Sequence, residues 1–195
     1  MKKIVIIGAN DFQNQLLLKA KEMGFETHVF AWQDGSIGER TADHFYPVSI
    51  VEIDEILEKC REIKPDAVAT IASDLANITV SKVAAGLGLP GNTPECIELS
   101  TNKYAMRSAF LKAGLPTPKF YKVDRVIPEL MEMELPVIVK PTDRSGSRAI
   151  TKVESSEELE TAIQQAIAQS FEKKAIVEEY ISGAEYSVET ISYQG

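Results

Sequence analysis

Short apolar runs alternate with amphipathic segments through the first hundred residues. Strand-like runs occupy residues 3–7, 26–30 and 67–71. Segments with apolar residues at helical spacing separate or follow them, at residues 16–23, 53–60 and 76–86. Val- and Ile-rich strands that alternate with helices pair in parallel, and the helices cover the sheet. We therefore predict an α/β fold with a Rossmann-like open parallel sheet for residues 1–98.

The pattern changes from about residue 100. A helix is predicted over 104–113, ending at Gly114, within a connecting segment 99–118. Further strands are predicted at residues 119–122, 136–140, 149–153, 175–178 and 186–191. A short helix is expected near 126–133 and a longer one over 155–170, opened by a capping box of Ser155 and Glu158. This order predicts a separate α+β module over residues 119–184, with residues 185–195 beginning another part.

Charge and composition narrow the class of protein. Among 195 residues, 21 Lys and Arg face 29 Asp and Glu, a net charge of −8. An acidic chain has no overall positive field to attract nucleic acid or an anionic membrane. The apolar runs are far shorter than the roughly 20 residues of a membrane span. Cys60 and Cys96 lack metal-ligand spacing. We expect a cytoplasmic protein that binds neither nucleic acid nor membrane.

The segment 139–152 concentrates positive charge. Its four cations, against one anion, give it a charge of +3, and its Pro and Gly residues favour a hairpin over a helix. A hairpin tip can offer backbone N–H groups and the hydroxyls of Ser145 and Ser147 to an anion, with Lys140 on the strand beneath. From this segment alone, a phosphate-binding loop and a solvated basic hairpin are about equally well supported interpretations.

A second segment, residues 176–188, ends a strand in paired carboxylates. Glu178 and Glu179 precede a turn at Ser182-Gly183, and Glu185 follows it. Such carboxylates can accept hydrogen bonds from an adenine amino group or a ribose hydroxyl. An exposed hairpin with solvated glutamates is the more ordinary interpretation of the segment by itself.

Together, these segments resemble the ATP-grasp superfamily. The helix opening at 101–107 and its exit at 113–118 are similar to the start of the family's grasp module. Val137-Ile138-Val139-Lys140-Pro141 resembles its lysine strand, and Ser145-Gly146-Ser147-Arg148 its phosphate loop. Residues 177–188 resemble the adenine and ribose hinge. The resemblance implies a Rossmann-like pre-ATP-grasp domain followed by the small (lid) subdomain, as in carbamoyl-phosphate synthetase-like and D-alanine–D-alanine ligase-like members.

The resemblance also implies roles for nine residues. The ATP phosphates would be contacted by Lys103, Lys140, Ser145, Gly146 and Ser147. The nucleoside would be bound by Glu178, the backbone of Glu179 and Ile181, and Glu185. Glu178 would accept from the adenine amino group, and Glu185 would hold the ribose hydroxyls. A small-molecule carboxylate would receive the γ-phosphate, and an amine or thiol would attack the acyl-phosphate.

Two departures from the family pattern matter. Ala149 stands where many relatives have glycine, which restricts the loop if that position needs a positive φ. In the family, the magnesium ligands lie after the glutamate that holds the ribose. In this sequence, Glu189 is the one carboxylate that follows Glu185. We expect a fragment of a longer enzyme, inactive alone. The alternatives are a chain that needs a partner and a nucleotide-binding or regulatory module without chemistry. Strand 186–191, left unpaired, would favour a homodimer.

Other candidates carry weaker signals. A single glycine, Gly8, follows the first strand, so a dinucleotide-binding oxidoreductase is disfavoured. Asp74 is as suited to capping a helix as to contacting substrate. His28 and His44 are interpreted as structural. Trp32, like Phe30, is expected in the core.

Overall fold

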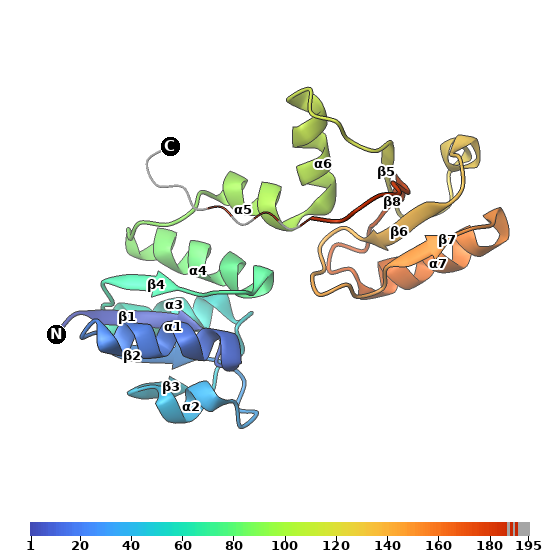
Figure 1. Cartoon of the computed structure of the whole chain (residues 1–195). Helices are drawn as coiled ribbons and strands as arrows, with labels where there is room; N and C mark the ends of the chain where they lie inside the picture. Colours follow the sequence, from blue (N-terminus) through green and yellow to red (C-terminus); the bar gives the residue numbers. More distant parts are fainter. Residues whose placement is uncertain (187, 189, 191–195) are drawn as a thin grey trace. The chain divides into compact units, whose positions relative to one another are not determined.

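The computed structural model describes residues 1–186, 188 and 190, and the chain forms two compact units, Met1–Met106 and Arg107–Gly195 (Figure 1). Each unit has its own four-stranded sheet. The sequence-based division at residues 98, 118 and 184 remains a prediction.

The first unit is built on a parallel sheet. Its strands are β1 (Lys3–Ile7), β2 (Glu26–Phe30), β3 (His44–Tyr46) and β4 (Ala67–Ala69), in the order β3-β2-β1-β4. Its helices are α1 (Asp11–Glu22), α2 (Ile37–Thr41), α3 (Ile53–Ile63), α4 (Asp74–Leu87) and α5 (Pro94–Thr101). All three strand pairings are parallel, which confirms the predicted Rossmann-like sheet.

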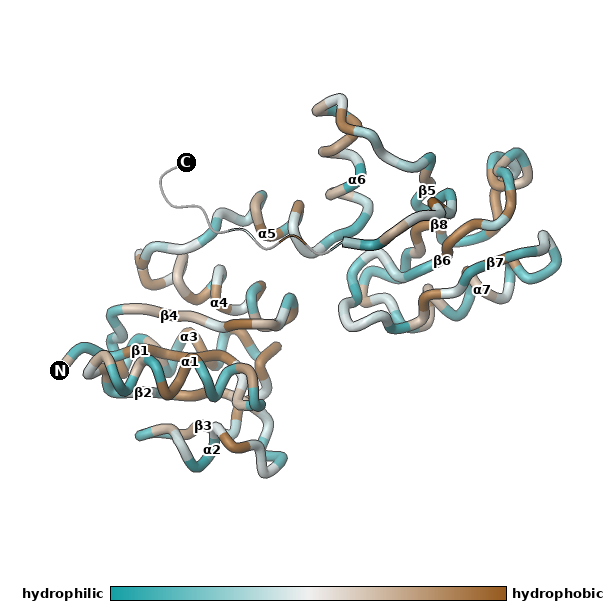
Figure 2. The backbone as a smooth tube through the Cα atoms, viewed as in Figure 1, coloured by the Kyte–Doolittle hydropathy of each residue, from teal (hydrophilic) through white to brown (hydrophobic). Residues whose placement is uncertain are grey.

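Both faces of this sheet are buried, because successive side chains on a strand point to opposite faces. On one face, Val5, Ile7 and Phe30 pack with residues of α3 and α4. On the other, Ile6 and Val29 pack with residues of α1. Figure 2 shows the resulting hydrophobic run along β1. Two-sided burial explains why β1 is continuously apolar from Ile4 to Ile7 rather than alternating.

The thiols of this unit differ in environment. Cys60 lies in the α3 core with no exposed surface, and burial raises the pKa of its thiol to about 12. Cys96, on α5, is exposed. Neither forms a disulfide.

Several expectations for the first unit need correction. The elements α2, β3 and α5 were not predicted, because each is eight residues or shorter and lacks a long periodic pattern. Trp32 is 50% exposed just beyond the end of β2, so the prediction of a core position was wrong. The side chain of Ser73, rather than that of Asp74, caps α4 by accepting from the backbone N–H of Ala76.

The second unit is built on an antiparallel sheet. Its strands are β5 (Phe120–Val123), β6 (Val137–Pro141), β7 (Thr151–Val153) and β8 (Ala175–Glu179), in the order β5-β8-β6-β7. Helix α6 (Lys103–Lys112) precedes them, a 3-10 helix η1 (Pro128–Glu132) follows β5, and α7 (Ser156–Gln169) joins β7 to β8. The predicted α+β character is confirmed.

Helix α7 covers one face of this sheet. Val137, Val139 and Val177 pack with Ile163 and its neighbours on α7. Side chains at alternate positions point to the other face. Ile138 is paired with Glu178 in the antiparallel register, so Glu178 lies on the face opposite α7 together with Lys140, two residues along β6. A cation and a carboxylate are thus placed on one face of adjacent strands.

Two details of the second unit differ from expectation. The predicted capping box of Ser155 does not form: the Ser155 side chain makes no capping hydrogen bond, and Glu158 accepts from the backbone N–H of Glu154. In the predicted strand 186–191, residues Tyr186, Val188 and Thr190 have no regular secondary structure, and the other positions lie outside the described residues. The homodimer expected through this strand stays a prediction. Among the described residues, no helix combines the length and apolar character needed to cross a bilayer.

The β6–β7 connection has an unusual backbone. Gly146, Ser147 and Ala149 adopt φ angles of 71°, 55° and 52°. L-residues with a Cβ are disfavoured in this left-handed region. Ala149 therefore occupies a conformation that suits glycine, as the departure from the family pattern indicated.

Replacing Ala149→Gly should raise the free energy of unfolding by about 0.5–1 kcal/mol, since the relief of left-handed strain exceeds the added chain entropy. The matched variant Gly146→Ala should lower it by about 1 kcal/mol. No atom lies within 4 Å of a Cβ built at Gly146, so that effect is purely conformational. Urea unfolding measures both changes in the free energy of unfolding. Changes of the same sign in the two variants would contradict the backbone geometry.

Candidate functional site

A buried carboxylate between two cations marks the open face of the second sheet. The Arg107 Nε donates to Glu178 Oε2 at 3.0 Å, and its Nη2 donates to Oε1 at 3.4 Å. The Lys140 ammonium also donates to Glu178 Oε1. The side chains of Glu178, Lys140 and Arg107 are 6%, 14% and 27% exposed. One carboxylate thus organises two basic side chains near the surface.

Three elements position this group. Lys140 comes from β6, Glu178 from the neighbouring strand β8, and Arg107 from α6. Strand pairing fixes the first two, because Lys140 and Glu178 each lie opposite a residue of the other strand on the same face. The residue that sequence reasoning missed is Arg107. It lies one helical turn after Lys103, inside the 101–107 segment, but nothing in the local pattern indicated a partner 71 positions away.

Opposing effects act on the Glu178 carboxyl. Burial acts to raise its pKa, because desolvation disfavours the charged form. Hydrogen bonds from Arg107 and then Lys140, with their positive charges, outweigh burial and lower the pKa below its ordinary value of 4.5. The carboxylate is therefore ionised at neutral pH.

The predicted phosphate loop lies at the end of β6. Ser145, Gly146 and Ser147 are exposed between β6 and β7. Asp143 anchors the start of the loop by accepting the backbone N–H groups of Phe171 and Glu172 at 3.2 and 2.7 Å. Left-handed residues in such a loop turn backbone N–H groups toward one side, which is the geometry of an anion-binding nest.

The cations of the basic hairpin are partly engaged within the protein. Arg144 lies 4.4 Å from the centre of the Phe171 ring. Lys152 lies 4.6 Å from the centre of the Tyr180 ring and pairs with Glu154 at 2.9 Å. The excess charge of this hairpin is thus not wholly available to a ligand.

The remaining predicted residues occur on or after the elements that carry this centre. Glu179 donates its backbone N–H to the Lys119 carbonyl, and its side chain is exposed. Ile181 and Glu185 are exposed beyond β8. Lys103 opens α6. Among the nine residues that the resemblance assigned to ATP, Lys140 and Glu178 are hydrogen-bonded to each other.

A magnesium site does not follow from the described side chains. Within residues 1–186, 188 and 190, the one group of three or more potential metal ligands is Glu26, His28 and His44, in the first unit. Magnesium prefers oxygen ligands, mainly carboxylates and water. The described carboxylates of the second unit do not form such a cluster.

Glu178→Gln should lower the free energy of unfolding at pH 7 by about 1.5–3 kcal/mol, the range for hydrogen bonds to charged groups. The folded pKa is depressed, so this contribution is present above pH 4.5 and is lost as pH falls through the folded value. Urea midpoints of wild type and variant should therefore converge below pH 4.5. Glu179→Gln, exposed on the same strand, is the control and should change stability by less than about 0.5 kcal/mol. A difference in urea midpoint between wild type and Glu178→Gln that stays constant from pH 7 to pH 3 would contradict the ion-paired state.

Known proteins share this architecture. Residues 100–195 match the sequence profile of the ATP-grasp domain. The D-alanine–D-alanine ligase of Coprothermobacter proteolyticus is 25% identical over 198 residues, which cover 96% of this chain and 61% of the relative. The crystal structure of an L-amino acid ligase from Bacillus licheniformis superposes with a TM-score of 0.77 at 23% identity, over 94% of this chain and 45% of that one.

A phosphoribosylglycinamide synthetase from Anaerococcus prevotii also superposes, with a TM-score of 0.65 at 28% identity, over 93% of this chain and 46% of its own. The chain thus spans from under half to about three fifths of the length of these relatives. Its relatives are ATP-grasp ligases. Residues 100–195 of the chain belong to the ATP-grasp family.

Proposed function

We propose that this chain is the ATP-binding portion of an ATP-dependent carboxylate–amine (or thiol) ligase. The observation that carries the proposal is the contact between Lys140 and Glu178 on the open face of the second sheet, where Lys140 belongs to the strand that leads into the 145–147 loop. It brings a cation suited to phosphate and a carboxylate suited to a nucleobase to one place.

The adenine side is argued from the hydrogen bonds of Glu178. A carboxylate offers about four lone-pair sites. Oε1 accepts from Lys140 and Arg107, while Oε2 accepts from the Arg107 Nε. Oε2 therefore retains capacity for one further donor, which we assign to the adenine amino group. The exposed carboxylate of Glu185 would accept from the ribose hydroxyls, and the exposed backbone of Ile181, with the Glu179 carbonyl, would lie along the ring edge.

The phosphate side is argued from Lys140 and the loop. An ammonium has three donors, and one is directed at Glu178. The other two would contact ATP phosphate oxygens while the pairing with Glu178 keeps the side chain in place. Ser145, Gly146 and Ser147 would close over the β- and γ-phosphates, with Lys103 as a second phosphate contact.

The chemistry assigned to the complete enzyme is phosphoryl transfer to a carboxylate. A carboxylate oxygen attacks the γ-phosphorus, the bond to ADP breaks, and an acyl-phosphate forms. The amine or thiol then attacks the acyl carbon, and inorganic phosphate leaves. The protein contributes by holding the reactants in line and neutralising charge on the γ-phosphate. Two of the named relatives are a D-alanine–D-alanine ligase and an L-amino acid ligase, so we propose a small-molecule carboxylate as substrate.

We further propose that the magnesium ligands of the reaction come from outside the described residues, and that this chain alone binds nucleotide without turnover. The proposal is supported by the scattered carboxylates of the second unit. A regulatory nucleotide-binding module is the competing assignment.

Lys140→Met should weaken ATP binding by at least about tenfold, because it removes a charge-assisted phosphate contact while keeping the aliphatic stem. Isothermal titration calorimetry with ATP measures the effect. Lys152→Met removes the same charge from the same hairpin and serves as the matched control, with an expected change under about threefold.

Circular dichroism verifies that both variants fold. Equal affinities of wild type and folded Lys140→Met, or an equal loss in both variants, would refute the assigned role of Lys140. In the full-length protein with ATP and magnesium, release of ADP on addition of a carboxylate would separate a ligase from a regulatory module.

A further inference from the structure

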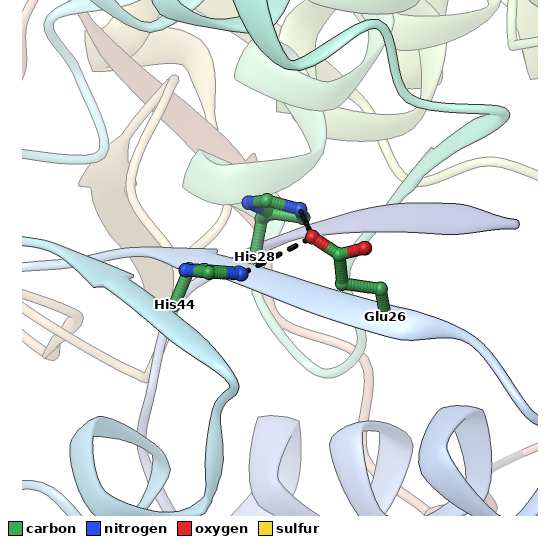
Figure 3. A group of neighbouring side chains, drawn as sticks. All are labelled: Glu26, His28 and His44. Atoms are coloured by element: carbon green, nitrogen blue, oxygen red, sulfur yellow. Dashed lines mark hydrogen bonds and ion pairs between the residues drawn. The ribbon is translucent and has the colours of Figure 1, made fainter. Parts of the chain in front are cut away.

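Both histidines of the chain meet at one carboxylate in the first unit (Figure 3). Glu26 Oε1 lies 3.1 Å from His28 Nε2 and 3.1 Å from His44 Nε2. The two imidazole rings stack with centroids 4.5 Å apart. The ligand atoms of the three residues all lie within 4.8 Å of one another. The proposed nucleotide site uses none of these residues.

The parallel sheet brings the three side chains together. Glu26 and His28 are two positions apart on β2, so they point to the same face. His44 is paired with His28 in the register of β2 and β3, which places it on that face as well. Because β3 is the edge strand, His44 is half-exposed, whereas His28 is buried and Glu26 is 22% exposed. The group is fixed on its inner side and open on its outer side.

The spacing approaches that of a coordination shell. Zinc takes imidazole nitrogens and carboxylate oxygens at about 2.0–2.2 Å in tetrahedral geometry, which separates neighbouring ligand atoms by about 3.4 Å. Both N···O distances, 3.1 Å, are within a few tenths of an ångström of this separation. A rotation of the half-exposed His44 ring would bring the third distance, between the two imidazole nitrogens, close to the same separation. Water would complete the coordination on the open side.

On the buried side, the other nitrogen of His28 is held by Tyr46. His28 Nδ1 lies 3.0 Å from the Tyr46 hydroxyl. When the ring proton lies on Nδ1 and is donated to the Tyr46 oxygen, the His28 Nε2 lone pair can coordinate a metal ion in place of its present hydrogen bond to Glu26. Metal-binding histidines characteristically use their other nitrogen in such a hydrogen bond. The Tyr46 ring stacks on buried Phe30 at 4.6 Å, so its hydroxyl has a fixed position.

Charge around the group is mixed. Burial, and then the neighbouring His44, lower the pKa of His28, while the Glu26 carboxylate acts to raise it. Lys3, on the adjacent strand, is a nearby cation, and its ammonium is directed at the Ile63 carbonyl at 3.1 Å. Lys59, Cys60 and Glu62 of α3 lie near Tyr46. Lys3 opposes a bound cation, and the Glu26 charge compensates it.

We propose that Glu26, His28 and His44 form a binding site for a divalent transition-metal ion of the zinc type, which links edge strand β3 to β2. Two imidazoles and one carboxylate match the borderline ions and not magnesium or calcium, which prefer all-oxygen shells. The bound ion would replace the hydrogen bonds that now join the two rings through Glu26.

The test is titration of the metal-free full chain with ZnCl2 by calorimetry, in the Cys96→Ser background so that the exposed thiol cannot bind. We expect one ion per chain. His44→Gln and Glu26→Gln should each weaken binding by at least about tenfold, and Tyr46→Phe by about tenfold through the lost second-shell bond. Glu58→Gln, an exposed helical glutamate, is the matched control and should leave the affinity unchanged. Nitrogen-15 NMR should show zinc shifting the Nε2 signals of both imidazoles.

Absence of zinc binding below about 100 µM in the folded chain would overturn the proposal. So would binding that persists in the His44→Gln and Glu26→Gln variants, or NMR shifts confined to one imidazole. Since His44 and Glu26 are partly exposed, their variants should fold, and circular dichroism verifies it. MgCl2 in place of ZnCl2 should produce no shift of the imidazole signals.

Discussion

Desolvation of the Glu178 carboxylate is the constraint on which the second unit depends. A buried charge is tolerated only when it is paired and hydrogen-bonded, and Glu178 obtains this from Arg107 and Lys140. The pairing fixes α6 against the sheet and directs Lys140 along the open face. In the proposed nucleotide site, the same hydrogen bonds would set both the stability of the unit and the geometry offered to the ligand. Binding variants at any of the three residues therefore need matched stability measurements.

Much of the fold could be predicted from local pattern. The apolar run of β1 and the spacing in α3 and α4 identified the parallel sheet, because two-sided burial leaves a strong hydrophobic signal. The three-residue strand β3 left no such signal. Its position depends on pairing with β2, a tertiary contact that no short window contains. Trp32 was misplaced for a related reason, since hydrophobicity alone does not tell a core position from the end of a strand.

The candidate site could be predicted only in part. Lys140 and Glu178 belong to motifs with a recognisable order, and the structure brings their side chains together. Arg107 was missed because its role arises from the packing of α6 against β8. The Glu26, His28 and His44 group was also missed: the two histidines, 16 positions apart, were interpreted as structural. Strand register, which the sequence does not state directly, converts them into neighbours.

The contrast between the two cysteines has a practical consequence. Cys60 is enclosed by the α3 core and its thiol stays protonated at ordinary pH, whereas Cys96 is exposed on α5. Thiolate is the reactive species toward maleimides, so the folded chain has a single labelling position without any engineering. A fluorophore attached there would sit on α5, a few residues before the helix that supplies Arg107.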